Sequence, residues 1–349
     1  MTASEAPPFW WERPDWRAWA LWPLSAAYGF AASTRMKIAR REKVPAAVLC
    51  IGNLTVGGEG KTPLAIALAA EAGRQKIRAG FLTRGYGGTL IAPHLVTLTD
   101  TARAVGDEPL LLARHAPTVV ARNRAAGARR LIQEGCELII MDDGFQSARV
   151  HMDYALIVVD AARGLGNGHV IPAGPLRAPV TDQMRHADGV VAMGEGPGAD
   201  IVVRSASRAG GPVSPARLPA RDASLLKGAR VLAFAGIGNP QKFYDTLRKL
   251  GVEVAETRSF PDHYPFGEED IAELKSEAAA KGLSVVTTEK DMVRLVDGPE
   301  ALREFARSVL VLPVEAVFEQ QSAPTAIIRE TMKVWRERML EGNSQPYGR

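Results

Sequence analysis

The stretch Val48-Leu-Cys-Ile-Gly-Asn-Leu-Thr-Val-Gly-Gly-Glu-Gly-Lys-Thr-Pro63 decides the fold of this chain. An apolar run ends in a glycine-rich turn, which is followed by Gly60-Lys61-Thr62 and by a segment with a helical pattern. This is the layout of a phosphate-binding P-loop, in which backbone N–H groups and a helix N-terminus surround an anion and the lysine reaches the terminal phosphates. The sequence therefore predicts nucleoside triphosphate chemistry.

The loop departs from the usual P-loop pattern at one position, because Thr55 stands where the first glycine is expected. The alternative interpretation is an ordinary strand–turn–helix junction, in which the glycines serve only the turn. The pair Lys61-Thr62 after an apolar run favours phosphate binding. The residues expected to contact the nucleotide are Thr55, Gly57, Gly58, Glu59, Gly60, Lys61 and Thr62.

Length and composition fit a globular protein of about two domains. Of the 349 residues, 46% are hydrophobic and 23% charged, which is enough for a sizeable core. The net charge of +4 suits an anionic partner, but it does not choose between nucleotide, membrane surface and nucleic acid. Cys50 and Cys136 lie in or beside apolar runs, so we expect them to pack in the core.

After residue 44 the chain alternates continuously apolar runs with helical patterns, as expected for buried parallel strands. The pattern predicts a P-loop-type α/β/α sandwich at 44–195, a linker region at 196–228 and a second, smaller α/β/α domain with a C-terminal helix at 229–349. The expected strands are 46–51, 79–83, 118–121, 138–141, 155–160 and 189–193, then 201–204 in the linker and 231–235, 284–287 and 309–313 in the second domain.

The N-terminal segment, residues 1–43, is rich in tryptophan. An uncharged stretch at 18–34 precedes a basic segment at 35–43, which is the reverse of the order in a signal peptide. Indole rings and basic residues beside an apolar stretch are typical of a helix on a membrane surface. The alternative is a helix whose aromatic face packs on the protein's own core. The tryptophans are Trp10, Trp11, Trp16, Trp19 and Trp22.

Acidic residues follow the apolar run 138–141, where the chain reads Asp142-Asp143-Gly144. An acidic residue at the carboxyl end of a buried parallel strand lies beside the P-loop in this architecture and can hold Mg²⁺. The hydroxyl of Thr62 is a further candidate ligand. A helix N-cap is the alternative role for Asp142, but the pair after a P-loop favours the metal.

A kinase also needs groups that deprotonate or position an acceptor hydroxyl. Asp107 and Glu108 begin a helical segment and are candidates, although aspartate is also common at helix N-caps. His263 lies between prolines and aromatics in the stretch 260–266, where it could equally bond its own loop. Arg177 ends a stiff turn that could present it to an anionic substrate group.

Taken together, these motifs resemble the tetraacyldisaccharide 4'-kinase family, the lipid A 4'-kinases of Gram-negative bacteria. Thr55 then fits, because the family itself has a hydroxyl residue at this place in its loop. The matching pieces are 48–63, 83–88, 106–109, 142–146, 160–177, 260–266 and 287–291.

The resemblance implies transfer of the ATP γ-phosphoryl group, with Mg²⁺, to the 4'-hydroxyl of a tetraacylated glucosamine disaccharide 1-phosphate in lipopolysaccharide biosynthesis. It also implies a peripheral place on the cytoplasmic face of the inner membrane, contacted through the N-terminal helix. We expect no nucleic-acid partner and no obligate protein partner.

The resemblance also assigns roles to individual residues. Asp107 resembles the catalytic base, and His263 the partner that orients it and tunes its pKa. Lys61 and Thr62 would hold the β- and γ-phosphates and Mg²⁺. The remaining expected contacts are Asp142, Asp143 and Glu108 with the metal, Tyr86 and Gln146 with the nucleotide, and Arg177 with the substrate.

Two other functions remain open at this point. A membrane-associated P-loop ATPase or GTPase switch would hydrolyse nucleotide without forming a phosphorylated lipid. An ATP-dependent ligase would release ADP only with an amine or amino acid. Asp107 and His263 favour the kinase, because simple hydrolysis does not require an acceptor-side base and its orienter.

Overall fold

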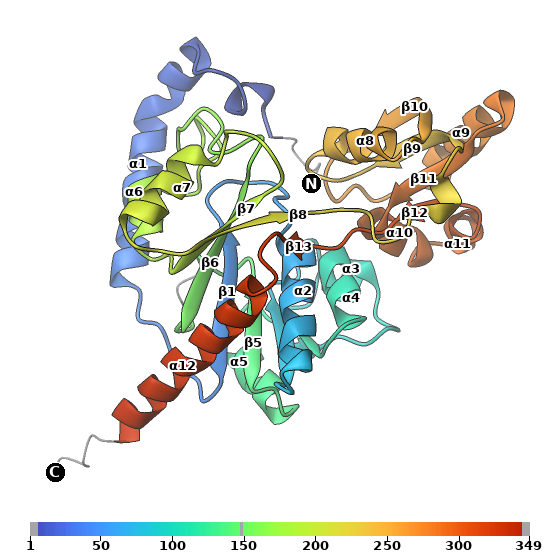
Figure 1. The fold of residues 1–349 in the computed structure, drawn as a ribbon. Coiled ribbons are helices and arrows are strands. Elements are labelled where there is room, and N and C mark those ends of the chain that lie inside the picture. The colour runs from blue at the N-terminus through green and yellow to red at the C-terminus, as the bar shows by residue number, and fades with distance from the viewer. Residues whose placement is uncertain (1–5, 147–148, 344–349) are drawn as a thin grey trace.

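The computed structural model describes residues 6–146 and 149–343. Within them the chain forms two sheets that lie side by side (Figure 1), a larger one in the order β13-β8-β7-β6-β1-β5-β2-β4-β3 and a smaller one in the order β10-β9-β11-β12. The larger sheet contains β1 (Ala47–Asn53), β2 (Ala79–Thr83), β3 (His94–Leu95), β4 (Thr118–Val120), β5 (Leu138–Asp142), β6 (Tyr154–Asp160), β7 (Gly189–Met193), β8 (Val213–Arg217) and β13 (Val317–Phe318). The smaller contains β9 (Arg230–Ala235), β10 (Glu253–Ser259), β11 (Ser284–Thr288) and β12 (Leu310–Leu312).

Helices cover both sheets, as the alternation in the sequence predicts. Those of the larger sheet are α1 (Trp16–Ile38), α2 (Lys61–Arg74), α3 (Ala102–Val105), α4 (Asp107–Ala113), α5 (Arg124–Gln133), α6 (Val180–Met184), α7 (Asp200–Arg208) and α12 (Ala323–Asn343). Those of the smaller are α8 (Pro240–Lys249), α9 (Glu268–Lys281), α10 (Glu289–Val296) and α11 (Glu300–Ala306). Short 3₁₀ turns lie at Pro8–Trp10 and Ser224–Leu226.

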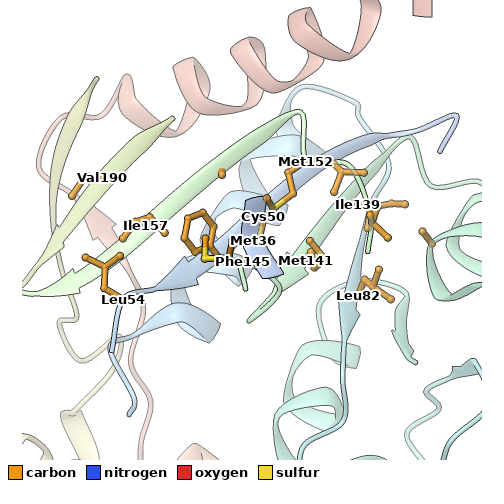
Figure 2. Close-up of a cluster of buried hydrophobic side chains, with 14 of the residues drawn as sticks. Met36, Cys50, Leu54, Leu82, Ile139, Met141, Phe145, Met152, Ile157 and Val190 are labelled. Atoms are coloured by element: carbon orange, nitrogen blue, oxygen red, sulfur yellow. The ribbon is translucent and has the colours of Figure 1, made fainter. Parts of the chain in front are cut away.

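The centre of the larger sheet is parallel and wholly buried. β1 pairs with β5 on one side and with β6 on the other, and all of its residues are buried. One apolar cluster fills the face beneath α1, α5 and α7, and Figure 2 shows Cys50 of β1 and Ile157 of β6 beside Phe145 in it. A second cluster fills the opposite face beneath α2 and α12. The predicted mixed α/β class with a predominantly parallel sheet is confirmed.

The structure differs from the expected linker with a strand at 201–204 within residues 196–228. The run 201–204, expected as a strand, lies in α7, where Val202 and Ala206 are buried one turn apart while Ile201 is 59% exposed. β-branched residues made this run look like a strand, but its burial has a helical period. β8 lies in the same segment and pairs with β7, so the expected linker belongs largely to the larger sheet.

The C-terminal helix also lies elsewhere than expected. α12 packs on the larger sheet, where Ile328 and Met332 join the cluster beneath α2. Arg338 of α12 reaches the carboxylate of Asp153, with Nε at 2.7 Å from Oδ1, and the carbonyl of Val44. The sequence placed this helix with the second domain because it follows the second α/β series along the chain.

The chain passes between the sheets through two segments that pair with each other. Ala220 and Val314 form an antiparallel bridge, the Arg221 N–H donates to Pro313 O at 2.9 Å, and the Glu315 N–H donates to Pro219 O at 3.1 Å. Residues 219–315 are therefore inserted between β8 and β13. We call this stretch the small-sheet unit and the remainder the large-sheet unit, and we propose that they are two domains.

Helix α1 buries mainly small residues, with Met36 as the exception, and exposes most of its large ones. The Ser25 hydroxyl donates to Val170 O at 2.6 Å, Gly29 faces Pro179, and the Ser33 hydroxyl donates to Asp182 at 2.6 Å. The exposed large side chains are Trp16, Trp19, Trp22, Leu24, Tyr28, Phe30 and Ile38, of which Trp16 and Phe30 are each 75% exposed. No helix in the described part of the chain combines the length and apolar character needed to cross a bilayer.

Candidate functional site

The phosphate loop connects β1 to α2, and the backbone requires two of its glycines, Gly57 and Gly60. Gly57 has φ of +118° and Gly60, the N-cap of α2, has φ of +88°. Side chains rarely adopt these angles, and a Cβ at Gly60 would also meet Leu218 at 3.0 Å. The loop therefore wraps the N-terminus of α2, where helical N–H groups favour an anion.

Thr55 and Glu59 stabilise the loop in the place of the missing glycine. Both are buried, and the Thr55 hydroxyl donates to the carboxylate of Glu59. Burial raises the pKa of Glu59 to about 7, against the opposing charge of Lys61 and the Thr55 hydrogen bond. The loop is thus fixed by a side-chain pair that a glycine could not form.

The proposed metal ligands lie beside the loop at the end of β5. The Thr62 hydroxyl donates to Asp142 Oδ2 at 3.1 Å, and Lys61 Nζ lies 3.7 Å from Asp143 Oδ1. Burial, and then the Glu108 carboxylate, raises the pKa of Asp142 to about 7. Burial alone would raise the pKa of Asp143 too, but Lys61 and Arg177 lower it to about 2. The cations thus outweigh burial at Asp143, whereas Lys61 does not outweigh burial and the Glu108 charge at Asp142.

Arg177 and Gln146 lie against the phosphate loop. Arg177 donates from Nε to Thr55 O at 3.0 Å and from Nη1 to Asp143 Oδ2 at 3.2 Å. Gln146 donates from Nε2 to Asn53 O at 2.7 Å. Both residues line the cleft beside the loop, and the contacts of Arg177 place it next to the loop.

The two acceptor-side candidates meet although they are 156 residues apart. Asp107 opens α4, and its Oδ2 lies 3.0 Å from Nδ1 of His263, which comes from the loop after β10. His263 has φ of +60°, an uncommon angle for a residue other than glycine that often marks a functional position. Gly106, rather than Asp107, is the N-cap of α4; Asp107 Oδ1 accepts from the first-turn Glu108 N–H at 2.8 Å, while Oδ2 faces His263.

Two cations on α10, which packs on α4, complete this side of the site. Arg294 donates from Nε to Asp107 Oδ2 at 2.7 Å, and Lys290 Nζ lies 3.1 Å from Glu108 Oε1. Burial would raise the pKa of Asp107, but Lys290, the hydrogen bond from His263 and Arg294 hold it well below its usual range. Neither cation was predicted from the sequence, although the matching stretch 287–291 contains Lys290.

One cleft of about 1870 Å³ connects these groups. Asp107 is only 4% exposed and lies behind His263, whose ring centroid is 4.9 Å from that of Tyr86. Tyr28 and Ala32 of α1 also line the cleft, so it extends from the exposed helix to the phosphate loop. Its other lining residues include Gly57, Gly58, Glu59, Gly60, Lys61, Thr62, Glu108, Asp142, Asp143, Gln146, Arg177 and Lys290.

A P-loop that shares a cleft with a histidine bonded to a buried aspartate is the arrangement of a P-loop phosphotransferase with a separate acceptor side. Comparison with known proteins gives the family. The family model described as tetraacyldisaccharide-1-P 4'-kinase, LpxK, matches residues 17–333, and the chain belongs to this family.

Individual relatives agree over nearly the whole chain. The chain is 69% identical over 342 residues to the tetraacyldisaccharide 4'-kinase of Chelativorans sp. (strain BNC1), covering 98% of this chain and 100% of that protein. It is 56% identical to the protein of the same name from Mesorhizobium japonicum, with coverage of 97% and 99%. The solved structure of Aquifex aeolicus LpxK in complex with ATP matches with a TM-score of 0.70 at 26% identity, covering 90% of this chain and 99% of that one.

Proposed function

We propose that this protein transfers the γ-phosphoryl group of ATP to the 4'-hydroxyl of a tetraacylated glucosamine disaccharide 1-phosphate. Family membership supports the reaction class and the lipid disaccharide acceptor. The observation that carries the proposal is one cleft lined both by the phosphate loop and by His263, whose ring bonds the buried Asp107. Phosphoryl transfer depends mainly on positioning and charge neutralisation, and both sides of this cleft supply them.

On the donor side, the loop N–H groups and Lys61 would bind the β- and γ-phosphates. Oxygen ligands suit Mg²⁺, which typically uses one or two carboxylates and substrate phosphates. Asp142 Oδ1 is buried and has no hydrogen-bond partner among the described residues, so it can take the ion; no group of three acidic or histidine side chains is gathered there in the described part of the chain, so substrate phosphates would complete the ligands. Thr62, Asp142, Asp143 and Glu108 would hold it. Bound Mg²⁺ would neutralise the charge that develops on the phosphates.

On the acceptor side, Asp107 would accept the proton of the 4'-hydroxyl, and His263 would orient the carboxylate. Because Asp107 lies behind His263 and both of its oxygens accept hydrogen bonds, one from the Glu108 N–H at 2.8 Å, it must be uncovered when the acceptor enters. A late proton transfer tolerates a weak base, since the phosphoryl transition state is loose. Tyr86 and Arg177 would line the path of the two substrates.

We also propose that α1 lies in the headgroup layer of the cytoplasmic leaflet of the bacterial inner membrane. The inner face of α1 is bonded to the large-sheet unit through Ser25 and Ser33, while most of its aromatic side chains are exposed, although Trp19 also packs against His169. Figure 1 shows α1 along one side of the larger sheet, beside α6. Indole and phenyl rings favour the interfacial region, and the basic residues at 35–43 favour anionic lipids.

The test is ATP-dependent phosphorylation of the lipid disaccharide 1-phosphate in mixed micelles, followed by transfer of radiolabel from [γ-³²P]ATP. The proposal expects labelled lipid only when enzyme, Mg²⁺ and acceptor are all present. A switch ATPase or GTPase would release inorganic phosphate at the same rate with or without the acceptor, and that result would refute the kinase.

A further inference from the structure

A short turn of the small-sheet unit contacts both the acceptor side of the cleft and the phosphate loop. It reads Gly236-Ile-Gly-Asn-Pro240 and connects β9 to α8, and we call it the bridging turn. Residues 237–240 line the cleft, as do Gly57 and Gly58 of the phosphate loop. The two loops come from different units and are far apart in the sequence, so their contact depends on how the units are placed.

The first residue of the bridging turn is bonded to the groups that hold the Asp–His pair. The Gly236 N–H donates to Asp291 Oδ1 at 3.1 Å. The Gly236 carbonyl accepts from the His263 backbone N–H at 3.2 Å and from Arg294 Nη1 at 2.9 Å. Arg294 in turn donates from Nε to Asp107 Oδ2 at 2.7 Å. The turn therefore moves together with the acceptor side.

The middle of the bridging turn lies against the phosphate loop. A Cβ atom at Gly238 would lie 3.3 Å from the backbone nitrogen of Gly58 and 3.8 Å from the Cα of Gly57. The first of these distances is shorter than an ordinary contact of a side chain. Gly238 is not among the glycines with positive φ, so its backbone would accept alanine. Glycine is needed here for the close approach of the two loops, and not for the conformation of the turn.

Further contacts across the same boundary hold the turn in place. Lys242 of α8, which begins at the end of the turn, donates from Nζ to Asp160 Oδ2 at 3.0 Å. Arg163 donates from Nη1 to the carbonyl of Gly238 at 3.4 Å, and its guanidinium lies 5.0 Å from the ring centroid of Trp11. Asp160 and Arg163 belong to the large-sheet unit, so both contacts join the turn to the unit that contains the phosphate loop.

The two loops are each fixed from behind. The hydrogen bond between Thr55 and Glu59 fixes the phosphate loop, and the bonds of Gly236 fix the bridging turn. The units themselves are connected only through the segments at 219–221 and 313–315 in the described part of the chain. An atom inserted at Gly238 should therefore move the small-sheet unit away from the phosphate loop, because neither loop can easily give way.

We propose that Gly238 is a positioning residue for phosphoryl transfer: its lack of a side chain lets the bridging turn rest on the phosphate loop and so sets the separation between the bound phosphates and the Asp107–His263 pair. This rests on the proposed kinase function. A displacement of about 1 Å at a reacting group can cost about 10²-fold in rate. The donor groups of the phosphate loop are untouched by such a displacement, so ATP binding should not depend on it.

The test compares wild type with Gly238→Ala in the full-length protein. The kcat is measured by transfer of ³²P to the lipid disaccharide 1-phosphate, the Kd for ATP by calorimetric titration, and the melting temperature by thermal unfolding. Gly238→Ala should lower kcat about tenfold, with the Kd for ATP and the melting temperature nearly unchanged. An unchanged kcat would overturn the proposal. A weaker Kd for ATP that matches the loss of turnover would also overturn it, because Gly238 would then belong to the nucleotide site.

A larger side chain tests the dependence on distance. Gly238→Val, where it melts at the wild-type temperature, should lose more turnover than Gly238→Ala, about 10²-fold, because it moves the units further apart. A loss no greater than that of alanine would contradict a role in spacing.

Gly267→Ala is the matched control. Gly267 belongs to the same unit and also lacks a positive φ, but a Cβ there would meet only Asp270 Oδ2, at 3.4 Å. Its kcat should equal that of wild type. An equal loss in both alanine variants would assign the effect to the folding of the small-sheet unit and overturn the role of Gly238. Failure of the kinase proposal would appear separately, as absence of labelled lipid with the wild-type protein.

Discussion

Glu59→Gln should stabilise the nucleotide-free protein at neutral pH but leave its stability nearly unchanged in mild acid. Glu59 is buried in the phosphate loop, and burial raises its pKa from 4.5 to about 7. The folded protein therefore binds a proton that the unfolded chain has already lost above pH 4.5. The stabilising contribution of this group is complete below that pH and is lost as the pH rises through about 7.

The size of the effect follows from the shift. Each pKa unit corresponds to about 1.4 kcal/mol, so wild type should lose about 3 kcal/mol at this site between pH 4.5 and pH 8. Glutamine cannot ionise, and its carbonyl can still accept from the Thr55 hydroxyl. The variant should therefore gain on wild type by about 1.4 kcal/mol for each pH unit between pH 4.5 and about pH 7, and the difference should level off above that.

The assay is urea unfolding of both proteins from pH 5 to pH 8, without nucleotide, compared through the difference in free energy of unfolding. Glu71→Gln is a control for which the change in the free energy of unfolding should have the opposite sign. Burial raises the pKa of Glu71, but hydrogen bonds from Thr325, Gln75 and Arg74 outweigh it and lower the pKa. Glu71→Gln should thus be destabilising and nearly constant over this range. A constant gain for Glu59→Gln, or a gain that shrinks as the pH rises, would refute the reasoning.

Three further variants test the function. Asp107→Ala should lower kcat by about 10²–10⁴-fold with ATP binding retained, measured by lipid phosphorylation and nucleotide titration, and near-normal turnover would remove Asp107 from the base role. Thr62→Val keeps the shape of the side chain but removes a proposed Mg²⁺ ligand; the Mg²⁺ concentration for half-maximal activity should rise about tenfold or more, and an unchanged requirement would exclude the hydroxyl as a ligand. Replacing Trp16, Trp19 and Trp22 with alanine should move the protein from the membrane fraction to the soluble fraction, whereas unchanged partitioning would point to a different anchor.

The donor side could be predicted from sequence because its signals are local. Gly60, Lys61 and Thr62 are contiguous with the strand that positions them, and Asp142 ends the neighbouring strand of the sheet. A parallel sheet brings such strand ends together by topology alone. The structure brings together on one cleft the loop, Asp142 and Asp143, as the order of the motifs implied.

The acceptor side could not be derived in this way. Arg294 is 187 residues from Asp107, and the two meet only because α10 packs on α4 between units. No local pattern encodes that contact, and a basic residue on a short helix is usually solvent-exposed. The pairing of Asp107 with His263 came from resemblance to a family, and the two cations that hold the pair emerged only from the structure.

The paired segments at 219–221 and 313–315 make the small-sheet unit an excisable module. Its entry and exit lie side by side, so joining β8 to β13 through a tight turn would close the larger sheet as a hairpin, since these strands are already antiparallel neighbours. The shortened protein would keep the phosphate loop and α12 but lack His263, Lys290 and Arg294. Deleting 219–315 should therefore leave a smaller domain that keeps the phosphate loop but lacks the acceptor side of the cleft.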